Sequence, residues 1–599
     1  MDGTIYQRFQ EVVARDRHAL AIRYGGRNHT YGELDRRAQS VARSLGLPPD
    51  AERPVVAVLL GTDIVAEISA IVGVVAAGAV VVPLDAREPV RHLSRIIDQS
   101  RASTVLAGRA LLSLAAEVAP TLVAREIFDH AASDIPVAAH VSPDAPAYIC
   151  YTSGSTGEPK GVVATHRKTV AQARASATSL NHGPDDRHTL LHSLAAGAGR
   201  ATLWRALLSG GSLLPRRVTD EGVSDLRDWL DSEGATVLFC SPTLYRTFIA
   251  ELGPADQLRT VRVLRLVGER VLPEDFASFK RHFARGARFV NAYSLTEVGN
   301  VTESVLTHDS VVPDDVLPVG YPRAGRRVRV VDEAGEAVPP GVVGEIAVEN
   351  PYATGSDRPG LSGPPLFMTG DLGRMDPDGL LFHLGRRDFQ VKVRGFRVEI
   401  EGVEATLVRA PGVTQSAVVV RTNSQGEPML VAYAAGDRRL IDAERLRAFA
   451  VSHLPEGSVP SRFVILDALP LTASGKVDRR AINGLEDAIP AHAPLISGIS
   501  WSGRSVVEQA VARIWRELLG HDRFGADELF LEAGGDSLLA MRVLTRVRQQ
   551  LGVNVALPDF LRAPTVAALA ETVERQRIDD RRASDAELAR LLDEIESGQ

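Results

Sequence analysis

Short runs of branched apolar residues alternate with helical stretches between Pro54 and about Ser310. Six of these runs have the length and composition of buried strands: 55–60, 79–84, 103–107, 235–240, 261–267 and 288–293. Such an alternation of strand and helix predicts βαβ units and a parallel sheet. We therefore expect the first part of the chain to have an α/β fold.

The pattern changes from Arg326 onward, where shorter alternating runs are typical of antiparallel strands. A D-P-D-G turn at 376–379 separates two of them and predicts a hairpin. The polar run at 385–395 is a candidate boundary, because a compact alternation of helix, strand, strand and helix follows it and ends near Ile482. A small second domain is expected there.

The segment 486–503 is rich in Pro, Ala, Ser and Gly and lacks helical periodicity, which is typical of a linker. Several amphipathic helices are predicted between Ser505 and about Arg575. The final segment opens at Ser584, a candidate N-cap, and places leucines at helical spacing. It is either a docking helix or a solvated tail. No internal repeat of solenoid period is visible.

Composition supports several domains of ordinary globular type. The chain has 599 residues, an apolar fraction of 45% and a formal net charge of −7. Charges of both signs are interspersed without a basic stripe, which disfavours a nucleic-acid partner. Cys150 and Cys240 lie in apolar runs and give no disulfide or metal spacing, so we expect buried thiols and a reducing, cytoplasmic setting.

No membrane or secretory segment is expected from the sequence. The amino terminus lacks a basic region followed by an apolar one. The apolar stretch 64–84 is interrupted by Glu67, Gly73 and Pro83 and is interpreted as a buried helix running into a strand.

A loop rich in glycine and hydroxyl residues follows a predicted strand at 151–162, which reads Y-T-S-G-S-T-G-E-P-K-G-V. Glycines let the backbone approach a phosphate, and hydroxyl and amide groups donate to it. It is not a Walker loop. The candidate phosphate-binding residues are Thr152, Ser153, Gly154, Ser155, Thr156, Gly157 and Lys160.

A second motif, F-L-E-A-G-G-D-S-L at 530–538, places Ser537 at a predicted loop-to-helix junction. A serine exposed there is a candidate for covalent attachment. Some esterases use a G-D-S-L serine as nucleophile, but they need a histidine downstream, and no histidine follows Ser537. The missing histidine disfavours an esterase, so covalent attachment of another group stays the favoured role for Ser537.

Six further motifs occur in order: T-Y-G-E-L at 30–34, A-A-G-A-V-V-V-P-L-D at 76–85, N-A-Y-S-L-T-E at 291–297, T-G-D at 369–371, G-R-R-D-F-Q-V-K-V-R-G-F-R-V-E at 385–399 and L-T-A-S-G-K-V-D-R at 471–479. Together with the phosphate loop and Ser537, they resemble the adenylate-forming superfamily, specifically a nonribosomal peptide synthetase adenylation domain fused to a peptidyl carrier protein. The resemblance covers nearly the whole chain.

The resemblance implies an α/β fold in three parts. They are a large adenylation subdomain with parallel sheets and a distorted barrel, a small mobile α+β subdomain, and a four-helix-bundle carrier domain. The expected boundaries are 1–387 and 388–485 for the two subdomains, 486–503 for the linker, 504–577 for the carrier and 578–599 for the tail.

The resemblance also implies roles for matching residues. Glu297 would hold Mg²⁺ on the ATP phosphates, Thr296 would donate to the α-phosphate, and Lys476 would contact the substrate carboxylate and α-phosphate. The remaining nucleotide contacts would come from Asn291, Ala292, Tyr293, Asp371 at the ribose hydroxyls and Arg386. Asp388 would be the hinge, and 4′-phosphopantetheine would be attached to Ser537.

The implied reaction is attack of a carboxylate oxygen on the α-phosphorus of ATP with loss of pyrophosphate, followed by thioester formation on the carrier. It implies a phosphopantetheinyl transferase, a small-molecule carboxylic acid and a downstream condensation or ketosynthase enzyme in natural-product synthesis. The sequence leaves open whether an MbtH-like accessory protein is needed.

One position departs from the family pattern. Members that activate amino acids place an aspartate after the phosphate loop to pair with the substrate ammonium, and the alignment puts Gly197 there. An unpaired buried ammonium is costly, so we expect an acid without a free α-amino group. The other expected wall residues are Ala198, Ala201, Phe239, Arg265, Val267, Ala292, Asn300 and Val301.

Arg265 is the unusual residue of this set. If it points inward, it could pair with a second carboxylate or another polar oxygen of the substrate, but an outward orientation is equally compatible with the sequence. Two alternative functions remain at this point. They are a conventional amino-acid-activating loading module and a free-standing acyl-CoA ligase, although the latter would not need the carrier serine.

Overall fold

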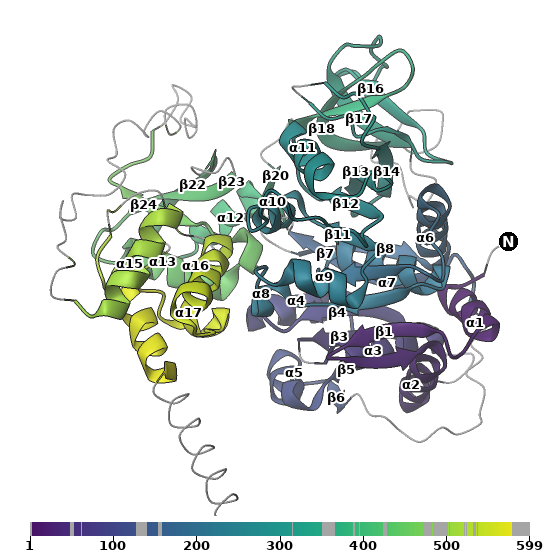
Figure 1. The fold of residues 1–599 in the computed structure, drawn as a ribbon, viewed down its shortest axis with the longest axis horizontal. Coiled ribbons are helices and arrows are strands. Elements are labelled where there is room, and N and C mark those ends of the chain that lie inside the picture. Colours follow the sequence, from purple (N-terminus) through teal and green to yellow (C-terminus); the bar gives the residue numbers. More distant parts are fainter. Residues whose placement is uncertain are drawn as a thin grey trace, which may run out of the picture.

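The computed structural model describes residues 3–47, 53–61, 63–126, 141–153, 159–313, 316–349, 366–386, 390–393, 396–422, 428–470, 482, 501, 504–519, 522, 524–530, 533, 535 and 537–577. The large subdomain contains two sheets with helices on both faces of each (Figure 1). These two sheets confirm the predicted α/β architecture.

The larger sheet has nine strands and is parallel through its centre. Antiparallel strands close both of its edges. In spatial order the strands are β15 (Tyr321–Pro322), β14 (Gly299–Leu306), β13 (Arg288–Leu295), β12 (Val263–Val267), β11 (Val237–Cys240), β9 (Arg187–Leu190), β10 (Ser212–Pro215), β1 (Leu20–Tyr24) and β2 (Arg27–Thr30).

The second sheet has six strands, and only its last pair is antiparallel. Its order is β6 (Val123–Glu126), β5 (Thr104–Ala107), β3 (Val55–Leu60), β4 (Val80–Asp85), β7 (Pro146–Ser153) and β8 (Pro159–Thr165). All six strands predicted from apolar runs are observed in these two sheets, because buried parallel strands need apolar residues on both faces.

Helices between and outside the sheets complete the layers of the large subdomain. One apolar cluster joins both sheets through α1 (Ile5–Arg15), α2 (Tyr31–Ser44), α3 (Ile64–Ala76), α6 (His166–Leu180) and α7 (Gly197–Ser209). The outer face of the nine-stranded sheet packs on α8 (Val218–Glu221), α9 (Leu226–Glu233), α10 (Pro242–Ile249) and α11 (Pro273–His282). The outer face of the other sheet packs on α4 (Val90–Ser100) and α5 (Leu112–Val118), with the short η1 (Arg109–Leu111) before α5.

The T-Y-G-E-L motif begins α2 and connects this helix to the nine-stranded sheet. Thr30 and Glu33 form a capping box that starts α2. The buried hydroxyl of Tyr31 donates to the Gly211 carbonyl at 2.6 Å and so ties α2 to the turn before β10. Gly73 lets α3 approach α2, since a Cβ there would lie 2.6 Å from the Ala38 carbonyl oxygen. This motif therefore supports the fold rather than the chemistry.

The predicted antiparallel region forms a four-stranded sheet that packs on the ends of β13 and β14. Its strands are β16 (Val328–Val331), β17 (Gly344–Glu349), β18 (Leu366–Met375) and β19 (Leu381–Arg386). The predicted D-P-D-G hairpin joins β18 to β19.

The small subdomain contains β20 (Gln390–Val393), β21 (Phe396–Glu399), α12 (Ile400–Leu407), β22 (Val413–Thr422), β23 (Pro428–Gly436), α13 (Ala443–His453), η2 (Glu456–Ser458) and β24 (Arg462–Leu466). It follows the expected order of helix, strand, strand and helix. It contacts the large subdomain where α13 meets α4, and Arg91 Nη1 lies 2.6 Å from His453 Nε2.

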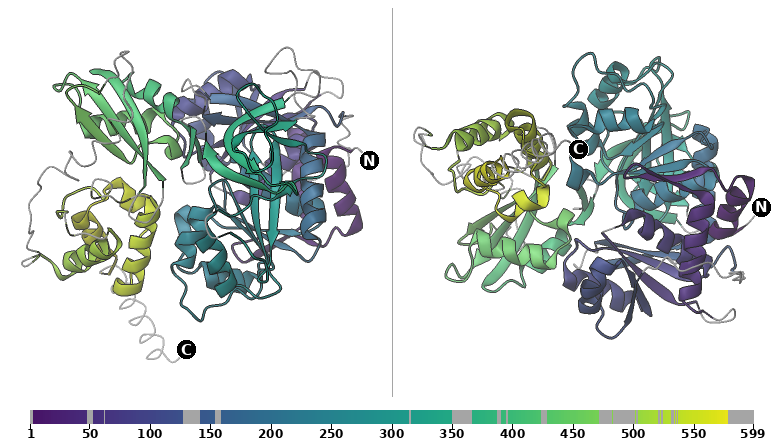
Figure 2. Two further views of the ribbon diagram at one scale, coloured as in Figure 1. Left: turned by 90° about the horizontal axis from the view of Figure 1, so that it is seen from above. Right: turned by 60° about the horizontal axis from the view of Figure 1, so that its bottom comes forward.

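The carrier region is helical and lies beside the small subdomain (Figures 1 and 2). Its helices are α15 (Val506–Leu519), α16 (Ser537–Leu551), α17 (Leu557–Arg562) and a last helix at 566–577. Trp515 is fully buried and packs edge-on against Phe530, with ring centroids 4.6 Å apart. No helix in the described part of the chain is long and apolar enough to span a membrane.

Candidate active site

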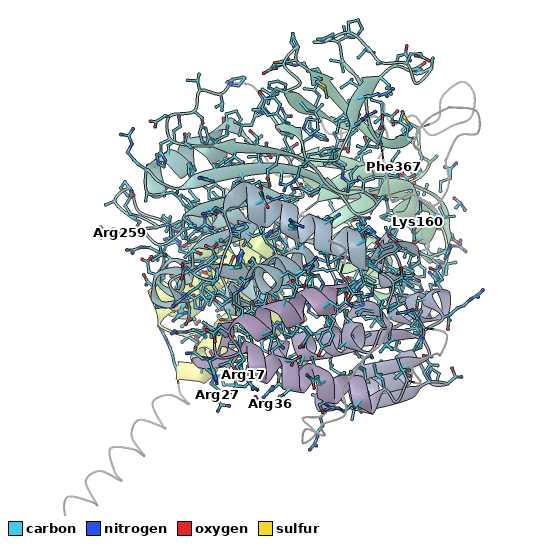
Figure 3. All side chains as sticks on the ribbon, turned by 90° about the vertical axis from the view of Figure 1, so that its right-hand side faces the viewer. Arg17, Arg27, Arg36, Lys160, Arg259 and Phe367 are labelled. Atoms are coloured by element: carbon cyan, nitrogen blue, oxygen red, sulfur yellow. The ribbon has the colours of Figure 1, made fainter. Side chains whose placement is uncertain are left out.

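The predicted phosphate loop connects two paired strands. β7 and β8 run antiparallel, and their last register pairs are Thr152 with Lys160 and Ser153 with Pro159. Lys160 is exposed on β8 and is labelled in Figure 3. Thr152 and Ser153 are described by their backbone alone, and Gly154, Ser155, Thr156 and Gly157 lie outside the described residues. The strands thus position both ends of the loop.

The predicted ribose carboxylate is buried beside two aromatic rings. Asp371 on β18 is 1% exposed and accepts a hydrogen bond from the Tyr293 hydroxyl. His383 Nε2 on β19 lies 3.3 Å from Asp371 Oδ1, and its ring centroid is 5.4 Å from that of Tyr293. Two predicted nucleotide residues, Tyr293 and Asp371, are therefore brought together, and His383 joins them although the sequence did not single it out.

The T-G-D motif orients Asp371 through its own first residue. The Thr369 hydroxyl donates to the Ile346 carbonyl at 2.7 Å and accepts from the Asp371 amide at 3.1 Å. Gly370 has φ +72°, a conformation that favours glycine. Asn291, another predicted nucleotide residue, is instead bound to the Pro318 carbonyl at 3.0 Å.

The candidate Mg²⁺ ligand lies in the turn between β13 and β14. The half-buried Glu297 follows Thr296 there, and the backbone of the turn is held by two cations from elsewhere. Lys168 Nζ on α6 donates to the Glu297 carbonyl at 2.6 Å, and Arg326 Nη2 donates to the Val298 carbonyl at 2.6 Å. Burial and Arg326 lower the pKa of Lys168 to about 8. A carboxylate beside a hydroxyl suits Mg²⁺, which prefers oxygen ligands.

The predicted substrate pocket is centred on one wall of aromatic and small side chains. Phe239, Val267 and Ala292 form a cluster against which Ala198 packs. Strand register explains this grouping, because Phe239 is opposite Arg265 and Val267 is opposite Ala292. The strand residues of this group project from one face of the nine-stranded sheet toward α6 and α7.

Gly197 begins α7 and is exposed. A Cβ built there would meet no atom within 4 Å, whereas a Cβ at Gly199 would lie 2.2 Å from the Ser193 carbonyl oxygen. Ala201 is also exposed. The start of α7 therefore faces open space.

Val301 lies apart from the Phe239 cluster. It is buried with Tyr293 and Leu295 in the cluster that contacts the four-stranded sheet. Asn300, its neighbour, belongs to the pocket side. In the orientation that satisfies its amide, Asn300 accepts from Arg265 Nη2 at 2.9 Å and donates to the Tyr293 carbonyl at 3.2 Å.

Arg265 projects into the protein and is 3% exposed. It pairs with Glu303 on β14, which also pairs with Arg323. Burial raises the pKa of Glu303, but Arg265 and Arg323 outweigh this effect and lower it to about 2. The inward orientation was one of the two that the sequence allowed. Its partner, 38 residues away in the chain, could not be inferred from the pattern.

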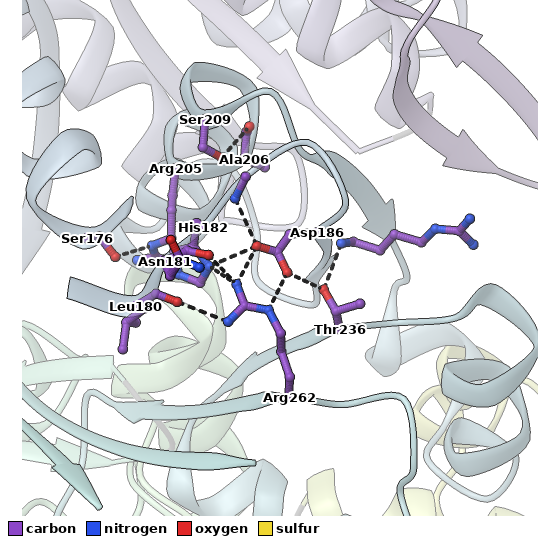
Figure 4. Close-up of polar contacts among 12 residues, drawn as sticks. Ser176, Leu180, Asn181, His182, Asp186, Arg205, Ala206, Ser209, Thr236 and Arg262 are labelled. Carbon is purple, nitrogen blue, oxygen red and sulfur yellow. Dashed lines mark hydrogen bonds and ion pairs between the residues drawn. The ribbon is translucent and has the colours of Figure 1, made fainter. Parts of the chain in front are cut away.

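A further arginine on α7, Arg205, was not identified from the sequence. It is 4% exposed, its Nε donates to Ser176 Oγ at 2.9 Å, and its guanidinium lies 5.0 Å from the centroid of the Phe239 ring. The contact with Ser176 is shown in Figure 4. An arginine in the otherwise apolar helical run T-L-W-R-A-L-L was the signal that could have found it.

A neighbouring cluster of His182, Asp186 and His188 has the residue types of a metal site, with ligand atoms within 4.8 Å of one another. Asp186, however, is already bound by Arg262 at 2.5 Å and by the Thr236 hydroxyl at 2.7 Å (Figure 4). Burial lowers the pKa of His182 and of His188, although Asp186 opposes this effect at His182. The guanidinium of Arg262 makes this cluster an internal ion-pair network rather than a cation site.

The candidate attachment serine begins a helix, as expected. Ser537 is the first residue of α16 and is described by its backbone alone. A Cβ at Gly535 would lie 2.4 Å from the buried Phe530 ring, so position 535 requires glycine for packing. On the same helix, Arg542 lies 3.8 Å from Glu251 just beyond α10. Lys476, Asp388 and the 578–599 tail lie outside the described residues, as does the side chain of Arg386.

Family models match three parts of the chain. An AMP-binding enzyme model covers residues 9–355, its C-terminal domain model covers 402–476, and a phosphopantetheine attachment site model covers 509–573. With the fold, these matches define an adenylate-forming ligase followed by a carrier domain. The chain belongs to the AMP-binding enzyme family.

Related proteins give the same assignment. The chain is 32% identical over 605 residues to a dimodular nonribosomal peptide synthase of Bacillus subtilis (strain 168), covering 95% of this chain and 25% of that protein. It is 32% identical over 597 residues to tyrocidine synthase 3 of Brevibacillus parabrevis, covering 96% of this chain and 9% of that protein. The chain thus spans a quarter or less of these two relatives.

A solved structure of a holo nonribosomal peptide synthetase protein that contains adenylation and PCP domains, bound to a vinylsulfonamide inhibitor, resembles the whole chain. The TM-score is 0.77 at 26% identity, with 95% of this chain and 96% of that chain covered. The o-succinylbenzoate CoA synthetase of Bacillus subtilis shares the fold over 81% of this chain, with a TM-score of 0.70 at 21% identity and 99% of that chain covered.

Proposed function

We propose that this chain activates a carboxylic acid lacking a free α-amino group and loads the acyl group onto its own carrier. In the first step a carboxylate oxygen attacks the α-phosphorus of ATP and pyrophosphate leaves. In the second, the pantetheine thiol on Ser537 attacks the acyl carbon, its proton is lost and AMP leaves. Acid activation and carrier loading follow from the family, whereas the substrate class and the residue roles are proposals.

Nucleotide binding would depend on the residues around Asp371. This buried carboxylate, positioned by Tyr293 and by the Thr369 turn, would accept the ribose hydroxyls. Glu297 would hold Mg²⁺, which neutralises the phosphates when bound, and Lys168 would keep the backbone of that turn in place. Lys476 would stabilise the charge that develops at the α-phosphate.

The observation that supports the substrate class is the shortage of carboxylates on the elements that form the predicted pocket walls. Within α7, β11, β12, β13 and β14, Glu303 is the sole acidic residue. It is already neutralised by Arg265 and Arg323. An α-ammonium entering beside Gly197 would find no carboxylate on these elements, and burying it unpaired costs several kcal/mol in principle.

Pyrophosphate exchange with matched acids tests this proposal. Each α-amino acid is compared with its hydroxy, keto and deamino analogues in wild type and in Gly197→Asp, with Gly197→Asn as the uncharged control. We expect the amino-free acids to exchange at least about tenfold faster in wild type. We expect Gly197→Asp, but not Gly197→Asn, to shift the preference toward amino acids. Fastest exchange by wild type with an ordinary α-amino acid would overturn the substrate class.

Carrier loading is tested separately by intact mass. Protein co-expressed with a phosphopantetheinyl transferase is expected to gain one pantetheine adduct, and then an acyl group when ATP and the acid are added. Ser537→Ala is expected to lose both additions while it retains pyrophosphate exchange. An adduct that persists in Ser537→Ala would place the attachment elsewhere.

We further propose that the acyl group on the carrier passes to a condensation or ketosynthase enzyme in nonribosomal peptide or hybrid polyketide synthesis. The relation to the dimodular nonribosomal peptide synthase and to tyrocidine synthase 3 supports this assignment.

A further inference from the structure

The pocket side of the nine-stranded sheet carries more positive than negative buried charge. Arg205, Arg265 and Arg323 lie within electrostatic reach of one another, and Glu303 is the one carboxylate they face. Both Arg265 and Arg323 pair with Glu303. Three guanidiniums therefore share one carboxylate, which forms ion pairs with Arg265 and Arg323 and acts on Arg205 only from a greater distance.

Arg205 is held in position but incompletely bound. Its Nε donates to Ser176, while its buried Nη1 has no hydrogen-bond partner among the described residues. Burial lowers its pKa to about 9, and repulsion from Arg265 adds to this effect. A buried guanidinium with an unused donor is costly in a folded protein, and such groups normally have an anionic partner.

The position of Arg205 relates it to the substrate. Ala198 and Arg205 are seven residues apart on α7, so they share a face of the helix about 10 Å apart along its axis. Ala198 packs on the Phe239 cluster from the start of the helix, and Arg205 covers the Phe239 ring from further along. Arg205 therefore lies at the deep end of the wall that begins at Gly197.

The register of β12 and β13 also places the positive groups deeper in the sheet than the Phe239 cluster. Val267 and Ala292 pair near the carboxyl ends of β12 and β13, where α/β sheets bind their ligands. Arg265 lies two residues earlier on β12, about 6–7 Å deeper into the sheet. The positive groups thus lie deeper in the sheet than the Phe239 cluster, away from the candidate nucleotide residues Tyr293 and Asp371.

We propose that the acid activated by this chain carries a second carboxylate, which Arg205 binds at the floor of the pocket. This inference rests on the proposed acid-activating function and names its substrate class as a dicarboxylic acid. One carboxylate is adenylated near Gly197, and the other pairs with the unused face of the Arg205 guanidinium. A planar guanidinium suits a carboxylate because it can donate two parallel hydrogen bonds.

The test compares acids that differ only at the far end. Pyrophosphate exchange by the full chain is measured with straight-chain dicarboxylic acids of five to eight carbons, their monomethyl esters and monocarboxylic acids of equal length. We expect kcat/KM for the best dicarboxylic acid to exceed that for its monoester about 10- to 100-fold. Arg205→Met should remove this preference, and Arg205→Lys should retain part of it.

A matched control lies on the same helix. Arg200 contacts the Tyr148 ring at 5.4 Å and not the Phe239 ring, so Arg200→Met should leave the ratio of diacid to monoester unchanged. If Arg205→Met does not fold, Ser176→Ala removes the anchor of Arg205 instead and should reduce the ratio severalfold. Thermal denaturation checks the folding of each variant.

The outcomes separate this inference from the proposed function. Monoesters or monoacids that match the diacids in wild type, or an unchanged ratio in folded Arg205→Met, would overturn the second carboxylate. In that case Arg205 acts only by packing on Phe239. An α-amino diacid preferred over its deamino form would contradict the proposed absence of an amino group while supporting the role of Arg205.

Discussion

Two buried ionic clusters lie on the same face of the nine-stranded sheet, and they differ in charge balance. Asp186, Thr236 and Arg262 each directly precede a strand, so their network lies at the amino-terminal edge of the parallel strands. Arg205, Arg265, Arg323 and Glu303 lie on the pocket side. The first network pairs one carboxylate with one guanidinium, whereas the second has three guanidiniums for one carboxylate.

This difference in charge balance is the basis of our proposal that the second cluster binds a ligand, whereas the first serves the fold. The Asp186–Arg262 pair balances its own charge at the start of the strands, although the neighbouring His182 Nε2 and both ring nitrogens of His188 have no hydrogen-bond partner among the described residues. The second, open cluster has an excess of positive charge, and its Arg205 Nη1 has no hydrogen-bond partner among the described residues. The comparison can be tested by replacing Glu303 and Asp186 in turn. Substitutions at the start of α7 then test the space beside the predicted pocket.

Glu303→Gln should have the largest effect, because it leaves Arg265 and Arg323 buried without a counter-charge. We expect a loss of roughly 3–5 kcal/mol in the free energy of unfolding, measured by urea denaturation at pH 7. The pKa of Glu303 is lowered from 4.5 to about 2 in the folded state. The stability that its charge provides is therefore fully present above about pH 4.5 and is lost as the pH falls toward 2. A wild-type advantage that does not shrink between pH 6 and pH 3.5 would contradict the ion-pair explanation.

Asp186→Asn should have the next largest effect. Its partner Arg262 keeps 34% of its side chain exposed, so water compensates part of the loss. We expect a decrease of roughly 2–4 kcal/mol in the free energy of unfolding. The control is Asp185→Asn, an exposed neighbour. In contrast to variants of the open cluster, Asp186→Asn should leave the relative kcat/KM values of different acids unchanged, and a changed substrate preference would remove the distinction.

Gly199→Ala and Gly197→Ala compare the stability cost of adding a Cβ where neighbouring atoms fill the space with the cost where the space is open. The Cβ at 199 would collide with the Ser193 carbonyl, and we expect a loss of roughly 1–3 kcal/mol. The Cβ at 197 meets no atom within 4 Å, so stability should change by less than about 0.5 kcal/mol. Thermal midpoints of the two variants provide the measurement. Equal destabilisation would show that the start of α7 does not face open space.

Thr236→Val should have the smallest effect. The Thr236 hydroxyl donates to Asp186 at 2.7 Å and accepts from the Arg187 amide at 2.9 Å. Its removal should cost about 1 kcal/mol in the free energy of unfolding, because Arg262 still neutralises Asp186. A loss as large as that of Asp186→Asn would show that the hydroxyl, not the ion pair, holds this network together.

Much of the fold could be predicted from local pattern. The runs at 55–60 and 235–240 are apolar enough to be buried on both faces, and the D-P-D-G turn allows one simple connection. Strand order could not be predicted, since β1 at Leu20–Tyr24 pairs with β10, which comes almost two hundred residues later in the chain. Short half-polar strands such as β2 carry no comparable signal.

In the candidate site, too, some residues could be predicted from local motifs, whereas others depend on distant parts of the chain. Motifs pointed to Tyr293 and Asp371, and the fold brings them into contact. The contributions of His383 and Lys168 depend on partners from distant segments, so no local pattern revealed them, whereas Arg205 stands out in its apolar run but its contacts with Ser176 and Phe239 do not. Arg265 illustrates the limit most clearly, because its orientation is decided by Glu303 on another strand.

Both cysteines of the chain, Cys150 and Cys240, are buried, and burial raises the pKa of Cys240. Neither thiol is available to a water-soluble alkylating reagent while the protein is folded. A pantetheine arm would then provide the sole reactive sulfur of the native molecule. Alkylation without denaturant would count the pantetheine-bearing chains directly, and protection from alkylation would follow acyl transfer in real time without any engineered label.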